Sequence, residues 1–229
     1  MRFYIGKLKQ IIFITGADTG VGKTVFTGLL VSYLRKRGLN AAALKPICSG
    51  GRDDAKKIFR AMNGALSLDE INPWHFRAPI APSLAARLEQ REVKLPQLVA
   101  HIRKMQKHFD VLLVEGAGGL LSPLGGNFDS RDLILKLRAK PIVVAQNKLG
   151  VVNHLRLTLE ALPDAARRKA KIVLMTPAKA DSSTKTNRQL LTEFVEVKVI
   201  LLPHFRSISK VFGKPFAGGD LAALIAEII

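Results

Sequence analysis

The sequence predicts an α/β protein in which a mostly parallel sheet lies between two layers of helices. Short, continuously apolar segments alternate with longer segments of helical periodicity, which is typical of parallel strands buried on both faces. A glycine-rich loop also joins the first apolar segment to the first helical one. The chain has 229 residues, and we expect a single domain over residues 1–229.

The expected elements follow one another in this alternation. Strands are expected at residues 10–15, 41–45, 111–114, 141–146, 171–175 and 197–202. Helices are expected at residues 23–37, 54–62, 95–108, 152–162, 183–194 and, with Asp220 as its N-cap, 221–228. Ligands of such sheets bind beyond the carboxyl ends of the strands, so the polar residues that follow each strand are the candidate site.

The segment 11–24, IIFITGADTGVGKT, has the layout of a phosphate-binding P-loop. An apolar strand runs into a glycine loop that ends on Gly22, Lys23 and Thr24 at the start of a helix. Backbone N–H groups and the helix dipole there attract an anion, while Lys23 would contact the outer phosphates and Thr24 would ligate Mg²⁺. Five residues separate Gly16 from Gly22, one more than the usual spacing, which indicates a subset of P-loop proteins.

Further candidate residues follow the next two strands. Lys45 ends the second strand and could present a second cation to the reaction centre. Glu115 follows the strand at 111–114 and precedes a glycine-rich loop, where a carboxylate could hold Mg²⁺ beside a triphosphate. Asp54 could do the same, or could be an ordinary acid favoured by the dipole of its helix. Cys48, the only cysteine, has no evident acid–base partner in the sequence, and we interpret it as a small loop residue.

The charge of the chain is strongly positive, with 36 Lys and Arg residues against 18 Asp and Glu residues and a formal net charge of +18. Such a balance indicates nucleic acid, an acidic partner or an anionic substrate, or simply a basic solvated surface. The basic residues are spread over the polar faces and last turns of the expected helices, and aromatic residues are not interleaved with them. We therefore expect no specific nucleic-acid partner, but weak, salt-sensitive adhesion to polyanions.

The sequence contains no apolar run of the ~18–20 residues that a membrane span needs. The basic and then apolar N-terminal segment leads straight into the glycine loop, so we do not interpret it as a signal peptide. A single cysteine excludes an intramolecular disulfide. We expect a cytoplasmic protein without a membrane partner.

Taken together, these motifs resemble those of the dethiobiotin synthetase family of biotin biosynthesis. Segment 16–24, GADTGVGKT, is similar to the family's GTxTxVGKT loop, including its extra residue, and KPICSGG at 45–51 is similar to KPVxSG. Asp54 and Ala55 match the last two residues of the family's SDA segment. The segments NPWHFRAPIAPSLAA, VEGAGGLLSPL and KLGVVNHLRLT, at 72–86, 114–124 and 148–158, resemble NPxxFxxPxSPHxAA, VEGAGGxxVPL and GLGTINHTLLT. The matches occur in order from about residue 11 to residue 158.

The resemblance implies an ATP-dependent ligase that joins CO₂ to 7,8-diaminopelargonate. An amine becomes a carbamate, which attacks the γ-phosphate of MgATP, and the mixed anhydride closes on the second amine to form the ureido ring. Such a step depends on positioning and charge neutralisation more than on a strong base. The family is a homodimer with its active site at the interface, which implies the same for this chain.

The resemblance also implies the roles of individual residues. Catalysis would use Lys23, Lys45, Thr19 and Ser49, the last two to orient the diamine or carbamate. Mg²⁺ would be held by Thr24, Asp54 and Glu115. The nucleotide would contact these residues and Gly20, Val21, Gly22, Val25, Gly116, Ala117, Gly118, Met175, Thr176 and Pro203. The substrate would contact Ser49 and, from the neighbouring subunit, Leu149, Gly150, Val151, Val152 and Asn153.

The sequence departs from the family pattern at four places, all on or near the nucleotide side. Ala17 stands where the family usually has Thr, and Met175 with Thr176 stands where an Asn reads adenine. The pattern IPxL becomes LPHF around Pro203, and Lys210 stands near an expected acidic residue. We therefore expect a nucleoside triphosphate with Mg²⁺ and leave its base open.

Three other classes of protein share parts of this sequence pattern. A ParA/MinD-like ATPase acting on DNA or membrane would carry a second lysine early in its loop, where Asp18 stands here. The amide-forming ATPase of corrinoid synthesis continues into a glutaminase domain, which these 229 residues do not contain. A degenerate nucleotide-binding protein would explain the altered base region, but the charged and hydroxyl residues Lys23, Thr24, Lys45, Asp54 and Glu115 are all intact.

Overall fold

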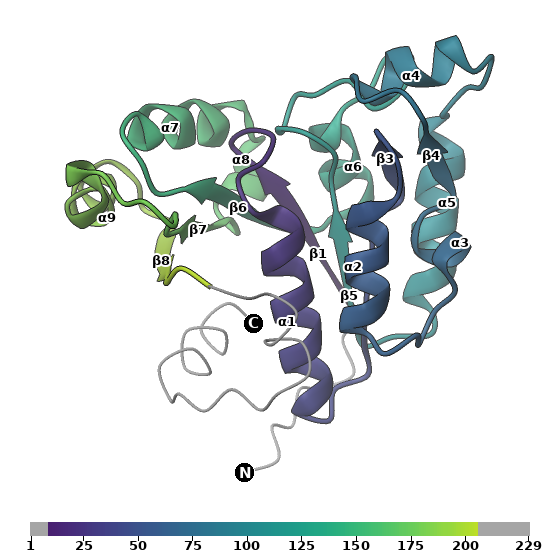
Figure 1. The fold of residues 1–229 in the computed structure, drawn as a ribbon, viewed down its shortest axis with the longest axis horizontal. Coiled ribbons are helices and arrows are strands. Elements are labelled where there is room, and N and C mark those ends of the chain that lie inside the picture. The colour runs from purple at the N-terminus through teal and green to yellow at the C-terminus, as the bar shows by residue number, and fades with distance from the viewer. Residues whose placement is uncertain (1–8, 206–229) are drawn as a thin grey trace.

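The computed structural model of the chain describes residues 9–205, so the expected helix at 221–228, Asp220 and Lys210 lie outside the described residues. The strands are β1 Gln10–Gly16, β2 Ala41–Leu44, β3 Ile47–Ser49, β4 Trp74–Phe76, β5 Val111–Glu115, β6 Lys140–Gln146, β7 Lys171–Met175 and β8 Lys198–Leu202. Six of them form a parallel sheet in the order β2-β5-β1-β6-β7-β8 (Figure 1). All six strands expected from the sequence are confirmed.

Helices cover this sheet on both sides. They are α1 Lys23–Lys36, α2 Asp53–Ala61, α3 Leu68–Ile71, α4 Pro82–Leu88, α5 Leu95–Gln106, α6 Ser130–Leu137, α7 Val151–Ala161, α8 Asp164–Arg167 and α9 Asn187–Phe194. Helix α1 packs on α2 and on strands β1, β2 and β5, while α5 and α6 pack on each other and on β5 and β1 (Figure 1). Because both groups cover the same strands, they lie on opposite faces, and the sheet is the middle of three layers.

The strands are buried on both faces, as their continuous apolar sequences predict. Phe13, Ile14, Leu44, Leu113 and Val143 have no exposed surface. The predicted α/β fold with a mostly parallel sheet between helices is therefore confirmed. Among the helices between residues 9 and 205, none has both the length and the apolarity that crossing a bilayer requires.

Several parts of the structure differ from the sequence-based expectation, and the helices α3, α4, α6 and α8 were not expected. A second, two-stranded parallel sheet joins β3 to β4, and neither strand was expected. The prediction of one helix at residues 183–194 is wrong for the first turn. Residues Ser182–Lys185 form a 3₁₀ helix, η1, and the α-helix α9 begins only at Asn187. Asp181 accepts a hydrogen bond from the N–H of Thr184, and side chains of this kind compete with α-helical backbone bonding.

Candidate functional site

The P-loop lies between β1 and α1, at the carboxyl edge of the sheet. Lys23, the first residue of α1, folds back so that its Nζ donates to the backbone oxygen of Asp18 at 2.9 Å. A Cβ added to Gly16 would come within 2.9 Å of that Nζ and 2.7 Å of the Asp18 oxygen. Gly22 has φ 100°, in the left-handed region that favours glycine. Both glycines are therefore required by the shape of this loop.

A buried polar cluster lies directly beneath the loop. The Thr24 hydroxyl donates to Glu115 Oε1 at 2.7 Å, and Lys45 Nζ donates to the same oxygen at 2.8 Å. Lys45 also donates to the Gly116 carbonyl at 2.7 Å. Only two of the three N–H donors of Lys45 are used by these bonds, so the third is available to a ligand. The ends of β2 and β5 and the start of α1 thus meet through three side chains.

Asp54 approaches the cluster from α2. Its carboxylate lies 3.9 Å from Lys45 Nζ and 3.5 Å from Lys57 Nζ, and Lys57 lies one turn further along the same helix. The backbone at Lys45 is held in turn by Asn72, whose side-chain amide donates to the Lys45 carbonyl at 2.7 Å. Arg52 donates to the Asn72 side chain and backbone, which ties the start of α2 to the same segment.

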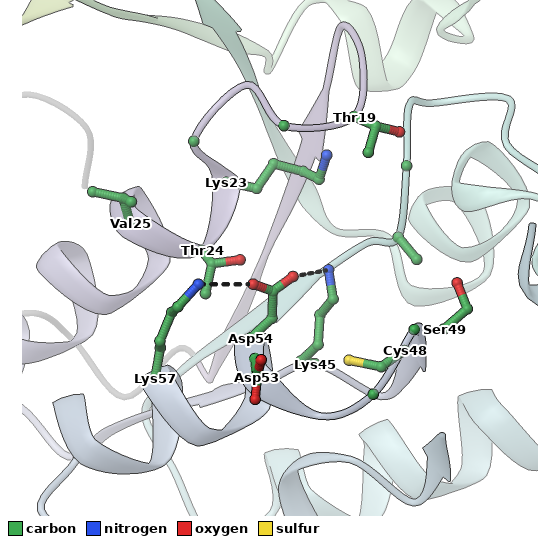
Figure 2. A pocket seen from close by; sticks show the side chains of 16 residues that line it. Thr19, Lys23, Thr24, Val25, Lys45, Cys48, Ser49, Asp53, Asp54 and Lys57 are labelled. Carbon is green, nitrogen blue, oxygen red and sulfur yellow. Dashed lines mark ion pairs between the residues drawn. The ribbon is translucent and has the colours of Figure 1, made fainter. Parts of the chain in front are cut away.

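These residues line a pocket of about 410 Å³. Figure 2 shows Lys23, Thr24, Asp54 and Lys45 pointing toward one space from three different elements, with Thr19 and Ser49 on its far side. The predicted site residues that line it are Thr19, Gly20, Gly22, Lys23, Thr24, Val25, Lys45, Ser49, Asp54, Ala117 and Gly118. Glu115 and Gly116 stand behind this lining and contact it through Lys45 and Thr24. The Val21 side chain is buried in the core beside the loop.

Burial and neighbouring charges change the ionisation of three groups in this pocket. Burial, followed by the nearby charge of Lys45, lowers the pKa of Lys23 to about 8. Burial alone would lower the pKa of Lys45, but Glu115, followed by Cys48 and Asp54, raises it above its ordinary value. Burial raises the pKa of the Cys48 thiol to about 11, although Lys45 opposes this. Cys48 therefore stays protonated at neutral pH. Its interpretation as a loop residue is wrong, because Cys48 is buried and lies in strand β3, where it pairs with His75 of β4.

The same cluster fits a divalent cation. Glu115 Oε2 is buried and has no hydrogen-bond partner, which is costly for a carboxylate oxygen unless a ligand satisfies it. Mg²⁺ is usually bound by one or two carboxylates together with phosphate oxygens, and Glu115, Asp54 and the Thr24 hydroxyl supply that kind of donor set. Residues 9–205 contain no cluster of three or more His, Cys, Asp or Glu side chains that could hold a metal ion without phosphate.

The residues expected to read the base lie at the ends of β7 and β8. The Met175 side chain packs against the loop, with its Cγ 3.2 Å from where a Cβ of Gly22 would be. The Thr176 hydroxyl and N–H both donate to the Leu202 carbonyl, at 2.7 and 3.0 Å. Neither Met nor Thr has a side-chain amide that could read a base, and the Thr176 hydroxyl already donates to Leu202. Pro203 follows β8 directly, and none of the three lines the pocket.

The segment expected to contact a neighbouring subunit lies apart from the pocket. Leu149, Gly150, Val151, Val152 and Asn153 form the start of α7, and the Leu149 side chain is 79% exposed. The N–H of Leu149 donates to the Asp181 carboxylate at 2.9 Å. Hydrogen bonds from Ser183, and then from Leu149 and Thr184, lower the pKa of Asp181 to about 2, so this turn is held by a charged acceptor.

Several residues of the site were not singled out from the sequence. Lys57, Asp53 and Gly51 line the pocket, and Asn72 holds the backbone of Lys45. The spacing of three residues between Asp54 and Lys57 on a helix was a usable signal for their contact. Asn72 is the first residue of the segment that resembles the family's NPxxF motif, but no local spacing indicated its contact with Lys45, which is 27 positions away in the sequence.

The parallel sheet and the loop at its carboxyl edge define a P-loop nucleotide-binding protein. The solved structure of the MinD cell division protein of Aquifex aeolicus is similar in fold, with a TM-score of 0.56 at 13% identity over 95% of both chains. The MinC:MinD complex of the same organism gives 0.58 at 12% identity, over 96% of this chain and 93% of that one. A family model described as an AAA domain matches residues 10–209.

Curated relatives identify the family within this class. The ATP-dependent dethiobiotin synthetase BioD of Thermodesulfovibrio yellowstonii is 37% identical over 224 residues, which is 89% of this chain and 92% of the relative. That of Anaeromyxobacter sp. (strain Fw109-5) is 44% identical over 155 residues, 66% of this chain and 70% of the relative. That of Methanococcus vannielii is 36% identical over 152 residues, 66% and 72%. The chain belongs to the dethiobiotin synthetase family.

Proposed function

We propose that this chain is an ATP-dependent ligase that converts 7,8-diaminopelargonate and CO₂ to dethiobiotin in biotin biosynthesis. Family membership supports the activity. The observation that supports this activity for this chain is the pocket in which Lys23, Lys45 and Thr24 converge beside the P-loop, with Glu115 behind them in contact with Lys45 and Thr24. Two lysines that face one space suit a reaction in which a carbamate and a triphosphate, both anionic, must approach each other.

The residues of the pocket have distinct tasks in this proposal. Lys23 and the N–H groups of the loop would bind the outer phosphates of ATP, which is a substrate of the reaction. The free N–H donor of Lys45 would hold the carbamate oxygens and the transferred phosphoryl group. Thr19 and Ser49, across the pocket, would orient the diamine (Figure 2). A second amine then attacks the activated carbonyl carbon, a C–N bond forms, and phosphate leaves.

A magnesium ion fits this proposal as the counter-charge of the phosphates. Thr24, Asp54 and Glu115 would hold it, and Glu115 Oε2 would gain the partner that it lacks. Bound there, the ion would neutralise charge on the phosphate oxygens. Lys57 would position the Asp54 carboxylate through their 3.5 Å ion pair.

The proposal includes a homodimer whose partner completes the substrate pocket. The start of α7 supports it, because Leu149 is exposed and the turn before it is already held by Asp181. In such a dimer Leu149 to Asn153 would reach the carboxylate of the substrate in the other subunit. We also place the enzyme in the cytoplasm, where the ATP that it consumes is produced.

The activity can be tested directly. The purified protein is incubated with 7,8-diaminopelargonate, bicarbonate, Mg²⁺ and ATP, and dethiobiotin is measured by mass spectrometry. We expect product with the wild type and with Lys56→Ala, which removes an exposed cation from the same helix as Asp54. Lys23→Ala should abolish turnover without loss of helical circular dichroism. No dethiobiotin at stoichiometric enzyme, with any triphosphate, would refute the proposal.

The nucleotide preference can be measured in the same assay. Because no free side-chain amide stands at Met175 or Thr176, we expect GTP and CTP to support turnover with kcat/KM within about tenfold of ATP. A site built to hydrogen-bond the base would discriminate by about 10⁴-fold or more. Discrimination of that size would show that another part of the chain reads the base.

A further inference from the structure

A second pocket, of about 380 Å³, lies at the amino ends of β6, β7 and β8, on the edge of the sheet opposite to the P-loop. The charged residues that line it are Lys140, Arg168, Lys169, Lys171, Lys198 and Glu196. The strand register explains this grouping, because Lys171 of β7 stands directly opposite Lys198 of β8, and β6 begins at Lys140. Five cations therefore surround one space with one carboxylate.

These cations are not all used by the fold. Lys140, Arg168 and Lys169 are exposed, and within residues 9–205 no carboxylate forms an ion pair with any of the three. Lys140 donates only to the side chain of Gln10, at 3.0 Å. The sequence outside residues 9–205 contains five basic and two acidic residues, so its formal net charge is also positive.

The positive charge continues along the same edge of the sheet. Helices that follow parallel strands run back across the sheet, so their carboxyl ends lie beside the amino ends of the strands. The last turns of α1, α5 and α6 carry Arg35 and Lys36, Arg103 and Lys104, and Lys136. Contacts join these ends: Arg35 donates to the first residue of β2, and Arg103 donates to the carbonyls of Lys136 and Leu137. We call this row of basic residues, together with the pocket, the basic edge; exposed Asp110 interrupts it at the amino end of β5.

We propose that the basic edge binds the phosphodiester backbone of duplex nucleic acid without regard to sequence. Six strands about 4.8 Å apart make this edge about 24 Å long, along which a duplex presents about 14 phosphates. The apolar residues of the pocket, such as Ile12 and Ile142, are buried in its floor. Among the described residues that line the pocket there is no aromatic ring to stack on a base, and only one apolar residue, Val197, is partly exposed, which favours a backbone contact over insertion into a membrane.

The position of this edge makes it compatible with the ligase activity. The P-loop pocket opens at the carboxyl ends of the strands and the basic edge lies at their amino ends, so a bound duplex would not cover the nucleotide. The net charge of +18 exceeds what an anionic substrate and a triphosphate require. Part of this excess positive charge lies on the basic edge.

The test measures binding of the full-length protein to a fluorescent 25-base-pair duplex of arbitrary sequence by anisotropy, between 50 and 300 mM KCl. One variant combines Lys140→Gln, Arg168→Gln and Lys169→Gln. Its matched control combines Arg87→Gln, Lys94→Gln and Arg188→Gln, which removes the same charge from exposed residues outside both pockets. We expect the first variant to lose affinity at least about tenfold at 50 mM salt and its salt slope to fall by about 2.7, at 0.9 for each contact.

The control variant should keep the wild-type salt slope. Equal losses in the two variants would mean that the whole surface acts by its net charge, and would overturn the proposal. So would binding of the wild type to vesicles with 30% phosphatidylserine but not to the duplex, because the partner would then be an anionic membrane. A strong preference for one DNA sequence would also contradict a contact made only to the backbone.

Discussion

Lys45 connects the charged residues of the site to one another. Its ammonium group contacts Glu115 and the Gly116 carbonyl, lies near Asp54 and is almost completely buried. Glu115 is buried as well, so each residue is the main counter-charge of the other. The position of Lys45 at the end of a strand predicted its place in the pocket, but not its contact with Glu115, which is 70 positions away.

Replacing Lys45 should therefore affect stability and activity separately. Lys45→Met leaves a buried carboxylate without its cation, and we expect the free energy of unfolding to fall by about 3–5 kcal/mol. The double variant Lys45→Met with Glu115→Gln should recover most of this loss in urea denaturation. Turnover should stay at least about 100-fold below wild type in both, because the cation at the reaction centre is missing. Equal stability of Lys45→Met and wild type would contradict the pairing.

Lys23 should make nucleotide binding dependent on pH. Its pKa of about 8 means that part of the free protein has a neutral Lys23 above that pH, whereas a bound triphosphate favours the charged form. Binding should therefore take up about 0.75 proton at pH 8.5, and affinity should fall as pH rises from 8 to 10. Calorimetry in two buffers of different ionisation enthalpy measures this uptake. In Lys23→Arg, which stays charged, the uptake should nearly vanish; an unchanged value would assign it to another group.

At the scale of elements, the P-loop depends on where α1 starts relative to β7. Gly22 caps α1 with φ 100°, and the Met175 side chain from the end of β7 packs against it. The loop is thus supported by β7, which lies two strands away from β1 in the sheet, and not only by its own sequence.

Gly22→Ala should distort this support. A side chain in the left-handed region costs about 1–2 kcal/mol, and the new Cβ would also contact Met175. We expect the melting temperature to drop and triphosphate affinity to be lost in a fluorescent-nucleotide titration. Adding Met175→Ala should not restore binding, because the backbone strain remains. Gly126→Ala is the matched control, since Gly126 has no positive φ and nothing near its Cβ position.

Elements with a strong local pattern were predicted well, and short ones were not. Strands of the main sheet and helices such as α5 have apolar patterns that do not depend on distant contacts. Strands β3 and β4 have three residues each and exist because they pair with each other. Helix α6 was missed although Asp129 and Asp132 form a capping box at its start, a signal that the sequence does contain.

At the scale of the whole molecule, the proposed dimer predicts that two inactive variants recover activity when they are mixed, which a monomeric enzyme could not do. Lys23→Ala removes the phosphate contact of its own subunit, whereas Asn153→Ala removes a side chain that would serve the partner. Each variant alone should be nearly inactive. After the two are mixed, unfolded and refolded together, about a quarter of wild-type activity should return, because half of the dimers contain one intact site. No recovery, with mixed dimers verified by mass, would place Asn153 outside the partner's site.

The sequence by itself determined the class of fold, the P-loop and the family, because these depend on apolar periodicity and on motifs whose residues are adjacent in the chain. The tertiary structure decided which residues meet. It placed Thr24, Lys45 and Glu115 on one another, added Lys57 and Asn72 to the site, and gathered Lys140, Arg168 and Lys169 at the opposite edge. Such contacts join residues on different strands and helices, and only the order of the strands in the sheet sets the distance between them.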